Sequence, residues 1–540
     1  MVGETTKAKA VEKGEMGMTD IIGNRTIPQL LKEMATLYPK KTFVVFEDQQ
    51  EQTSSLTYEE FLDKVRRLAR ALQQYGIQKG NKVLLHLPNG IDFMISWFSV
   101  TSIGAVMVPT NVLSTAEEMA YLLEHSETKL VITEKEYVHK FTRFRDQLNG
   151  LFLARSEEHD YGVSLQNIIH DTEPLTAFPR LSSDDIASIL YTSGTTSKPK
   201  GVLLTHANYI YVGEIMSKTL RMSPDDRVFI VLPMFHGNGQ YYLAMPALTV
   251  GASIAIAERF SASRYFQQAK RLRATVGSLF AAPLKMILKK PYRSADAEHS
   301  LRLIIFAQSI TREQLREFEQ RYRVSLRQLY GMTETVGTPL INPLDGYYNN
   351  SSMGRPTIGY RVKLVDENGH EVKDGEAGQI IVNGIPGRTI MKGYFHNEEA
   401  TSSTIKDGWL YTGDVARKDP NDGFFYFVDR QKDMIRRAGE NIAAGEVEEV
   451  INQCEGVFES AVIGVPDEIR DEAIHAFVIA KDGYDLSEQE IIDVCKQKLA
   501  KFKVPEAIHF VDEFPRTSVG KIQKHELKKF LYEKGAAKRK

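Results

Sequence analysis

The chain has 540 residues, of which 42% are hydrophobic and 26% charged, and its formal net charge at pH 7 is −2. This length exceeds what a single hydrophobic core normally supports, so we expect two or more globular domains. The near-neutral charge excludes a global field that would attract nucleic acid or an anionic membrane, and the longest apolar runs, such as 228–232, are too short to span a bilayer.

The chain ends and the cysteines predict a cytoplasmic protein. Residues 1–18 form a polar tail that lacks the apolar segment of a secretory signal, and 536–540 is a basic tail rather than a peroxisomal address. Cys454 and Cys495 are too few for a disulfide framework and suit a reducing compartment. We therefore expect no integral membrane segment.

Helix-like and strand-like patterns alternate along most of the chain. Apolar residues three and four positions apart predict a helix over 56–75, and an apolar run predicts a strand over 83–87. The alternation continues with strands at 253–257, 275–280, 303–306 and 324–330 and a helix at 264–271. This pattern is typical of an α/β fold with parallel sheets flanked by helices, in which ligand loops follow the carboxyl ends of strands.

A Ser/Thr/Gly-rich run, 191–201, follows the strand-like segment 186–190 directly. Its small residues would let the backbone approach an anion, and its hydroxyls and Lys200 could bind phosphate. A strand-like run, 202–204, and a helix cap, Thr205, come next, so this is not the common nucleotide loop that opens a helix with Gly-Lys-Ser/Thr. The alternative is a solvated turn. The predicted phosphate-binding residues are Thr192, Ser193, Gly194, Thr195, Thr196 and Lys200.

Further motifs follow in order at 330–334, 411–414, 429–440 and 515–521. Together with 191–201 they resemble the adenylate-forming superfamily, which contains acyl-CoA synthetases, nonribosomal peptide adenylation domains and luciferases. The resemblance covers nearly the whole chain.

Three other segments narrow the resemblance. Residues 19–23, 384–390 and 469–474 are similar to ligases that activate crotonobetaine and carnitine. The resemblance implies a large AMP- and acyl-binding domain of sheets flanked by helices over 19–430. A small, mobile α+β domain over 431–540 follows, with the hinge near Lys432.

The reaction implied by the resemblance has two halves. A carboxylate attacks the α-phosphorus of ATP to give acyl-AMP and pyrophosphate, and the thiol of coenzyme A then displaces AMP. Because the substrate is the nucleophile, the protein needs to align two anions and neutralise charge rather than supply a catalytic triad. The expected ligands are ATP, Mg²⁺, coenzyme A and a small carboxylic acid. The sequence leaves undecided whether the protein forms a homodimer.

Four residues are expected to carry the chemistry. Lys521 would neutralise charge between the carboxylate and the α-phosphate, and the alternative is an ordinary surface lysine. Thr333 would donate to the same groups. Glu334 is the expected Mg²⁺ ligand, helped by Thr196, because a hard cation prefers oxygen ligands.

The remaining nucleotide contacts lie in the other motifs. Tyr330, beside Gly331, offers an aromatic face for adenine, although a core tyrosine is an equal reading. Asp414 can accept from both ribose hydroxyls, unless it only caps a turn, and Arg430 would contact ribose or phosphate.

Two residues are implied for coenzyme A. Gly439 would line the pantetheine tunnel, because a side chain there would block a narrow thiol arm, and Arg436 would meet phosphate nearby.

The segment 233–239 corresponds to the acyl pocket, with His236 as its gate or as a plain buried histidine. Amino-acid-activating relatives carry Asp there, so His236 argues against an amino acid substrate. The stretch 233–248 contains no acid, but Tyr241 and Tyr242 could form an aromatic cage for a quaternary ammonium group. A carnitine-type acid and a plain fatty or aromatic acid therefore stay comparable.

Two other functions remain as alternatives. An adenylation enzyme that loads a carrier protein is disfavoured by His236 and by the absence of a carrier domain after Lys521. A non-catalytic nucleotide sensor is disfavoured because Lys521, Glu334 and Asp414 are all present. Residues 307–310 depart from the Gly/Ala-rich turn of relatives, which puts the local adenine and acyl contacts in doubt.

Overall fold

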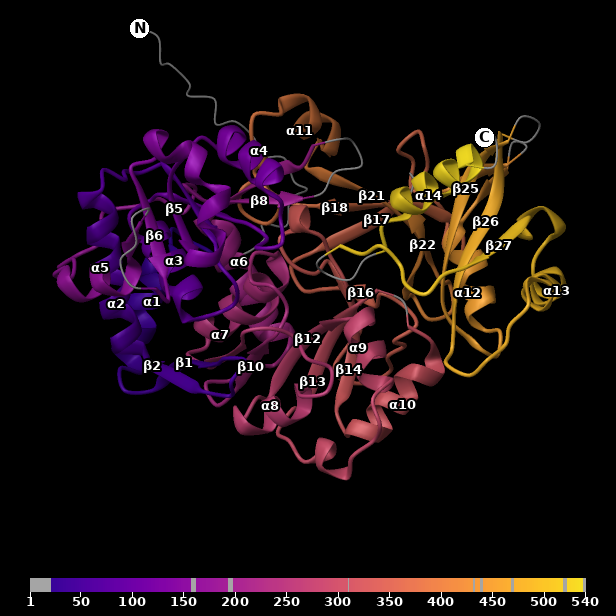
Figure 1. Ribbon diagram of the computed structural model, residues 1–540, viewed down its shortest axis with the longest axis horizontal. Helices are drawn as coiled ribbons and strands as arrows, with labels where there is room; N and C mark the ends of the chain where they lie inside the picture. The colour runs from indigo at the N-terminus through magenta and orange to yellow at the C-terminus, as the bar shows by residue number, and fades with distance from the viewer. Residues whose placement is uncertain are drawn as a thin grey trace, which may run out of the picture.

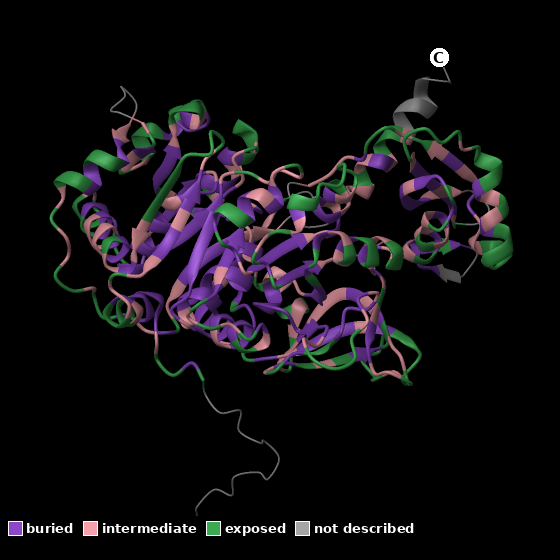
Figure 2. Ribbon diagram, turned by 90° about the horizontal axis from the view of Figure 1, so that it is seen from below, coloured by how far each residue is buried: buried purple, intermediate pink, exposed green. Residues whose placement is uncertain are grey.

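A computed structural model shows a large lobe and a small lobe joined near residue 430 (Figures 1 and 2). The structure describes residues 21–156, 162–192, 198–308, 310–430, 433–437, 440–467, 471–517 and 522–537; of 440, 441 and 532–537 it describes only the backbone. We call residues 21–430 the large lobe and 433–537 the small lobe. The predicted α/β fold with a smaller second domain is confirmed.

One sheet of the large lobe has nine strands in the order β16-β15-β14-β13-β12-β10-β11-β1-β2. The run from β14 to β1 is parallel, and the edge strands are antiparallel. The strands are β1 (Thr42–Glu47), β2 (Thr53–Thr57), β10 (Arg227–Ile230), β11 (Ser253–Ala257), β12 (Val276–Phe280), β13 (Leu303–Ala307), β14 (Ser325–Tyr330), β15 (Leu340–Ile341) and β16 (Arg355–Pro356).

The second sheet has eight strands in the order β19-β9-β8-β4-β3-β5-β6-β7. It is parallel from β8 to β7, whereas β8 and β9 form an antiparallel hairpin. The strands are β3 (Lys82–His86), β4 (Val106–Pro109), β5 (Thr128–Glu134), β6 (Gly150–Ala154), β7 (Val163–Ser164), β8 (Ile186–Thr192), β9 (Lys200–Thr205) and β19 (Gly393–Tyr394).

Buried helices join these two sheets into one core. In α3 (Ile91–Ser102) residues 93–102 are all buried, as expected for a helix that is apolar all round. The predicted helix over 56–75 is α2 (Tyr58–Gln74), and its seven predicted apolar positions are buried. Thr205 caps α6 (His206–Thr219), since its side chain accepts from the Asn208 amide.

Other helices of the large lobe cover the sheets or connect strands. They are α1 (Ile27–Leu37), α4 (Ala116–Ser126), α5 (Leu165–Asp171), α7 (Met245–Thr249), α8 (Tyr265–Arg271), α9 (Ala281–Leu288), α10 (Arg312–Tyr322) and α11 (Glu398–Thr404). Among the described residues, no helix combines the length and apolar character needed to cross a bilayer.

An antiparallel sheet ends the large lobe, and a mixed sheet, in which β27 runs parallel to β26, builds the small lobe. The first contains β17 (Arg361–Val365), β18 (Ala377–Asn383), β20 (Ile405–Lys406), β21 (Trp409–Lys418) and β22 (Phe425–Arg430). The second contains β23 (Ile435–Arg437), β24 (Glu440–Ile442), β25 (Val457–Asp467), β26 (Asp471–Ala480) and β27 (Ala507–Phe510), with α12 (Ala444–Asn452), α13 (Glu488–Lys498) and α14 (Lys524–Ala537). Cys454 and Cys495 are both buried in the small-lobe core.

Charged residues directly after the strand-like run 424–428 predict a loop over 429–433, but β22 continues through Arg430. Asp429 and Arg430 both have polar partners within the fold. Asp429 accepts from the Gly445 amide at 3.3 Å, at the start of α12, and Arg430 lies opposite Asp414 on β21. The boundary at 430/431 falls between β22 and β23 and stays a prediction, as does mobility of the small lobe.

Candidate active site

Tyr330, Asp414 and Arg430 come together where β14 meets the β21–β22 pair. The Tyr330 hydroxyl donates to Asp414 Oδ2 at 2.7 Å, and Arg430 Nε lies 3.4 Å from Oδ1. Burial and then the Asp414 carboxylate raise the pKa of Tyr330, so its hydroxyl stays protonated at neutral pH. Three residues from motifs 84 and 16 positions apart thus form one polar cluster that can bind hydroxyl groups.

The loop after β14 requires glycine at position 331. A Cβ there would lie 2.3 Å from the backbone oxygen of Gly337 and 2.7 Å from the Tyr242 hydroxyl. Val336 has φ +52°, a conformation that a β-branched residue rarely adopts, and its carbonyl accepts from the Tyr360 hydroxyl at 2.7 Å. Such strain, held by surrounding contacts, is common at ligand-binding loops.

Glu334 lies in the same loop, in a short 3-10 helix over Thr333–Thr335. Its side chain is 5% exposed, its Oε1 accepts from the Tyr394 hydroxyl at 3.0 Å, and its backbone oxygen accepts from the Met391 amide at 2.9 Å. Thr333 is half-buried beside it. Tyr394 carries no sequence signal for this role, because it lies 60 residues from Glu334.

Tyr394 also connects Glu334 to the predicted phosphate loop. Lys200 Nζ lies 4.8 Å from the centre of the Tyr394 ring, and Lys200 is opposite Thr192 in the β8–β9 hairpin. The hairpin therefore carries the predicted loop at its tip. Four of the predicted residues, Ser193, Gly194, Thr195 and Thr196, lie outside the described residues.

Helix α4 contacts both sides of this hairpin, which sequence reasoning missed. The Tyr121 hydroxyl donates to the Pro199 carbonyl at 3.1 Å, and His125 Nδ1 is 2.7 Å from the Tyr191 hydroxyl. Their spacing of four along a helix puts Tyr121 and His125 on one face, but no sequence pattern pairs that face with the hairpin.

The segment with His236 is fixed by Asn89, which was not predicted. The Asn89 side chain donates to the carbonyls of Leu232 and Ala257 and accepts from the Met234 amide at 2.9 Å. His236 is half-buried, with its ring 4.0 Å from that of Phe235. A short π-helix, Asn238–Ala244, follows. Such π-helical segments are frequent at functional sites.

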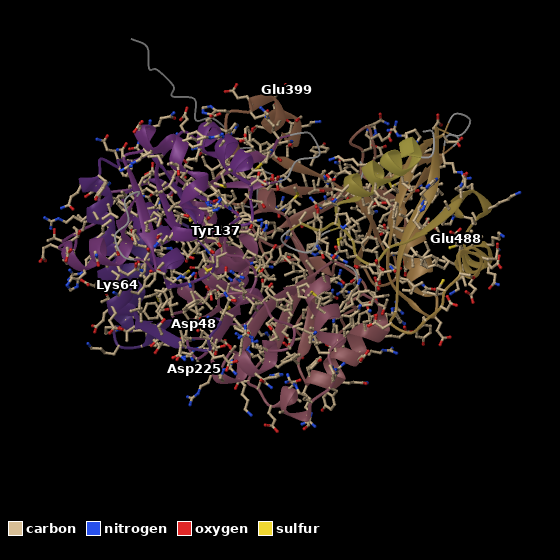
Figure 3. All side chains as sticks on the ribbon, viewed as in Figure 1. Asp48, Lys64, Tyr137, Asp225, Glu399 and Glu488 are labelled. Atoms are coloured by element: carbon tan, nitrogen blue, oxygen red, sulfur yellow. The ribbon has the colours of Figure 1, made fainter. Side chains whose placement is uncertain are left out.

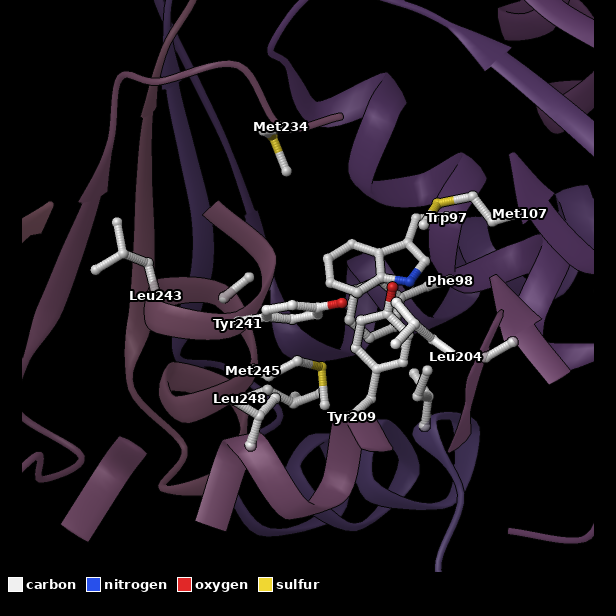
Figure 4. Packing of buried hydrophobic residues seen from close by; sticks show 14 of the residues in the cluster. Trp97, Phe98, Met107, Leu204, Tyr209, Met234, Tyr241, Leu243, Met245 and Leu248 are labelled. Carbon is white, nitrogen blue, oxygen red and sulfur yellow. The ribbon is translucent and has the colours of Figure 1, made fainter. Parts of the chain in front are cut away.

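Tyr241 and Tyr242 face different partners and do not form one cage. Tyr241 lies 6.0 Å, ring centre to ring centre, from Tyr209, which is 5.5 Å from Trp97 (Figure 4). Within the described residues the buried Tyr241 hydroxyl and Trp97 Nε1 have no hydrogen-bond partner. Tyr242 instead donates to the Gly337 carbonyl at 3.4 Å.

A cavity of about 510 Å³ lies between the two lobes beside His236. The large lobe contributes the segment 233–235 and Tyr137 (Figure 3), and the small lobe contributes Phe458, Glu459, Arg516 and Thr517. A larger cavity of about 620 Å³ is lined by the start of α3. None of the predicted site residues that the structure describes lines either cavity, but the smaller one is bordered by 233–235, next to His236, and by Arg516 and Thr517 of the motif 515–521. These two neighbouring motifs favour the smaller cavity as the place of the chemistry.

The motif of the predicted catalytic lysine borders this cavity through Arg516 and Thr517. Arg516 pairs with Ile522, and the Gln523 amide donates to the Pro515 carbonyl at 2.8 Å. Residues 518–521, and with them Lys521, lie outside the described residues.

The predicted coenzyme A and hinge residues are less defined. Arg436 is exposed on β23, where its amide donates to Glu472 at 2.8 Å, and none of its described contacts joins it to the residues above. Gly439 and Lys432 lie outside the described residues.

Magnesium binding by Glu334 fits its surroundings. The Glu334 carboxylate accepts a hydrogen bond from the Tyr394 hydroxyl. One protein carboxylate together with oxygens of a nucleotide is a common ligand set for Mg²⁺. In the described part of the chain, no three His, Cys, Asp or Glu side chains gather to hold a metal by themselves.

Comparison with protein families gives two matches that together span most of the chain. The description "AMP-binding enzyme" matches residues 31–395, and "AMP-binding enzyme C-terminal domain" matches 446–521. The chain belongs to the AMP-binding enzyme family. The resemblance expected from the motifs is thereby confirmed.

Its relatives place this AMP-binding enzyme among the acyl-CoA ligases. The crotonobetaine/carnitine–CoA ligase of Proteus mirabilis is 37% identical, with 94% of this chain and 100% of that protein covered. The protein of the same name from Salmonella paratyphi A is 35% identical with the same coverage.

Solved structures agree with this placement. An anthranilate CoA ligase in complex with anthranoyl-AMP has a TM-score of 0.87 and 26% identity, covering 95% of this chain and 98% of that chain. A benzoate CoA ligase from Burkholderia xenovorans has a TM-score of 0.84 and 29% identity, covering 93% and 100%.

Proposed function

We propose that this enzyme converts a carboxylic acid and ATP to acyl-AMP and pyrophosphate, and then acyl-AMP and coenzyme A to acyl-CoA and AMP. The observation that carries the proposal is the junction of the Tyr330–Asp414–Arg430 cluster with the Glu334 loop. The cavity that Arg516 and Thr517, from the motif of Lys521, share with the segment 233–235 adds support.

Asp414 binds the ribose in this proposal. Its carboxylate can accept from both ribose hydroxyls, while the Tyr330 hydroxyl and Arg430 fix its orientation. Tyr330 and Gly331 then border the adenine base. Because residue 331 has no side chain, its backbone lies close to Tyr242 and Gly337.

Phosphate is bound by Thr192 and Lys200 together with the loop residues 193–196. Glu334, with Thr196 and nucleotide oxygens, would hold Mg²⁺, which would neutralise charge on the phosphates. Lys200 sits over Tyr394, which in turn donates to Glu334, so the two phosphate-binding elements share one support.

Lys521 and Thr333 act at the reacting centre. A cation held against both the carboxylate and the α-phosphate offsets the charge that develops in the transition state. Arg516 and Thr517, in the motif that contains Lys521, line the cavity between the lobes, and Thr333 is half-buried in the loop that carries Glu334. Arg436 and Gly439 receive coenzyme A.

We propose a small carnitine-type acid as the substrate. Two full-length relatives at 37% and 35% identity are crotonobetaine/carnitine–CoA ligases. The buried Tyr241 ring lies against Gly237, next to His236, and continues through Tyr209 to Trp97 as a row of aromatic rings. Aromatic rings attract a quaternary ammonium group. Tyr242, which bonds the 331–337 loop, is not part of that surface.

An uncharged acid is the second candidate. The stretch 233–248 contains no acid to pair with a cation, and two structural neighbours are named as benzoate and anthranilate ligases. In such a pocket each buried methylene contributes about 0.8 kcal/mol, so chain length would determine specificity.

The deciding experiment compares crotonobetaine, crotonic acid and 5,5-dimethylhex-2-enoic acid, in which a tert-butyl group replaces trimethylammonium. AMP release that needs both the acid and free coenzyme A supports the ligase, whereas acid-dependent pyrophosphate release with no AMP release on addition of coenzyme A points to a carrier-loading enzyme. A kcat/KM for crotonobetaine that is about 10-fold or more above the values for both other acids supports a betaine substrate. A tenfold ratio corresponds to about 1.4 kcal/mol of transition-state stabilisation by the cation. Equal values for crotonobetaine and the tert-butyl acid would exclude a cation site.

A further inference from the structure

A buried ion pair joins the two lobes at the edge of the cavity. Lys285 on α9 of the large lobe and Glu459 on β25 of the small lobe are 3.2 Å apart, Nζ to Oε1. Their side chains are only 11% and 10% exposed. Neither residue belongs to any of the motifs that identify the family.

Glu459 is also bound to the motif that contains Lys521. Arg516 forms an ion pair with the other oxygen of Glu459 and pairs with Ile522, the residue that follows Lys521 in the chain. One carboxylate therefore connects the large lobe, through Lys285, to Arg516 and Ile522, which flank Lys521 in the chain.

A second contact fixes the register of the same interface. Lys289 Nζ lies 3.5 Å from the centre of the Phe458 ring, a cation–π contact. Lys285 and Lys289 are four residues apart, so they project from one side of α9 and its C-terminal end toward consecutive residues of β25. Two contacts resist sliding as well as separation of the lobes.

The charges in the cluster make its two partners unequal. Burial would raise the pKa of Glu459, but Lys285 and Arg516 hold it below its usual value, so the carboxylate is ionised at neutral pH. Neutralising Glu459 leaves two cations facing each other across the interface. Neutralising Lys285 leaves the Glu459–Arg516 pair intact inside the small lobe and removes only the link to the large lobe.

We propose that Glu459, through Lys285, is a positioning residue that holds Arg516 and Ile522, the described residues flanking Lys521 in the chain, against the large lobe during acyl-AMP formation. This inference rests on the proposed function for the role of Lys521. It assigns to the Lys285–Glu459–Arg516 cluster the orientation of the small lobe in the first half-reaction, without direct contact with substrate.

The test compares Lys285→Met and Glu459→Gln with the control Lys290→Met, which removes an exposed lysine five positions beyond Lys285. Acyl-AMP formation should slow about 10-fold in Lys285→Met and more in Glu459→Gln, with the KM for ATP little changed. Thioester formation from supplied acyl-AMP should change less than about 2-fold. Lys285→Arg should restore most of the rate.

The double variant separates positioning from general damage. If the two residues act as a pair, Lys285→Met with Glu459→Gln should be no slower than Glu459→Gln alone. Additive losses, or equal losses in both half-reactions, would overturn the proposal. Full activity of Lys285→Met would overturn it as well.

A measurement of shape tests the same inference without activity. Small-angle X-ray scattering of the full chain should give a larger radius of gyration for Lys285→Met than for the wild type and for Lys290→Met. Unchanged scattering would refute the link between the lobes even if the enzyme is an active ligase. Altered scattering in a protein inactive with every acid would instead retain the link and refute the proposed function.

Discussion

The two sides of the candidate site are held by different forces. On the large lobe, Tyr330 donates to a nearly buried Asp414, and the 331–337 loop packs so closely that Gly331 tolerates no side chain. At the small lobe, charged side chains make the contacts, chiefly Lys285 with Glu459. A buried, hydrogen-bonded side is preorganised, whereas charged groups at a lobe interface can be rehydrated when the lobes separate. The nucleotide side therefore has the contacts expected of a fixed surface, and the side with Lys521 is the one that we predict to be movable.

Replacing Lys521 should have the largest effect and tests the movable side. We expect Lys521→Ala to slow acyl-AMP formation by about 10²-fold or more, the usual cost of losing one preorganised charge contact. Thioester formation from supplied acyl-AMP should stay within a few-fold. The two half-reactions can be followed by pyrophosphate release and by thioester formation. Equal loss in both would contradict the assignment.

Replacing Asp414 tests the fixed side. Asp414→Asn keeps the shape but removes the charge that accepts from ribose and pairs with Arg430, so the Kd for AMP should rise about 10- to 100-fold. Titration calorimetry with AMP measures this directly. The matched change Tyr330→Phe removes only the hydroxyl that donates to Asp414 and should cost less. A larger effect of Tyr330→Phe would mean that Asp414 is not the ribose ligand.

The packing of the fixed side can be broken at Gly331. Gly331→Ala places a methyl 2.3 Å from a backbone oxygen, which cannot move without shifting the loop, and overpacking of this kind costs about 1–3 kcal/mol. AMP affinity should fall together with the melting temperature. Gly346→Ala is the control, because its φ of +72° is strained but its surroundings are open. It should lower stability by about 1 kcal/mol and leave AMP affinity unchanged.

The smallest expected effect is on the pH dependence of stability. It is tested by comparing one buried histidine in each lobe. Burial, followed by Lys140, lowers the pKa of His86 to about 3, so the folded large lobe keeps this ring neutral. The unfolded chain binds a proton below about pH 6.5, and stability from this group is therefore lost as pH falls from that value toward the folded pKa.

Urea titration at pH 7.5 and pH 5 measures this effect. His86→Gln should remove about 2 kcal/mol of the stability change between the two pH values. His475 in the small lobe is less deeply buried and its pKa is lowered less, so His475→Gln should remove less. Equal effects would contradict the difference in burial.

Much of the fold followed from local pattern. The periodicity over 56–75 gave α2, and the apolar run over 253–257 gave β11, because burial of one face requires those spacings. The Thr205 cap could be predicted because the residue that starts a helix bonds to the amides just after it. The continuation of β22 through Arg430 could not, since its partner Asp414 is on another strand.

The candidate site divides in the same way. Asp414, Glu334 and Tyr330 stand in ordered motifs and were predicted, although their roles remain proposals. Asn89 and Tyr394 were missed, because each acts on a residue 60 or more positions away. Tyr241 and Tyr242 do not form the expected cage, because consecutive residues of a helix point in different directions.

The sequence by itself determined the family, the α/β architecture and the order of the nucleotide motifs, because these depend on residue type and spacing within short segments. Only the tertiary structure decided which distant side chains meet. The Tyr394–Glu334 bond, the contacts of Asn89 and the pair of Lys285 with Glu459, 174 residues apart, depend on how the sheets and lobes are arranged. Such contacts leave no periodicity in the chain, because each partner is selected by packing in three dimensions.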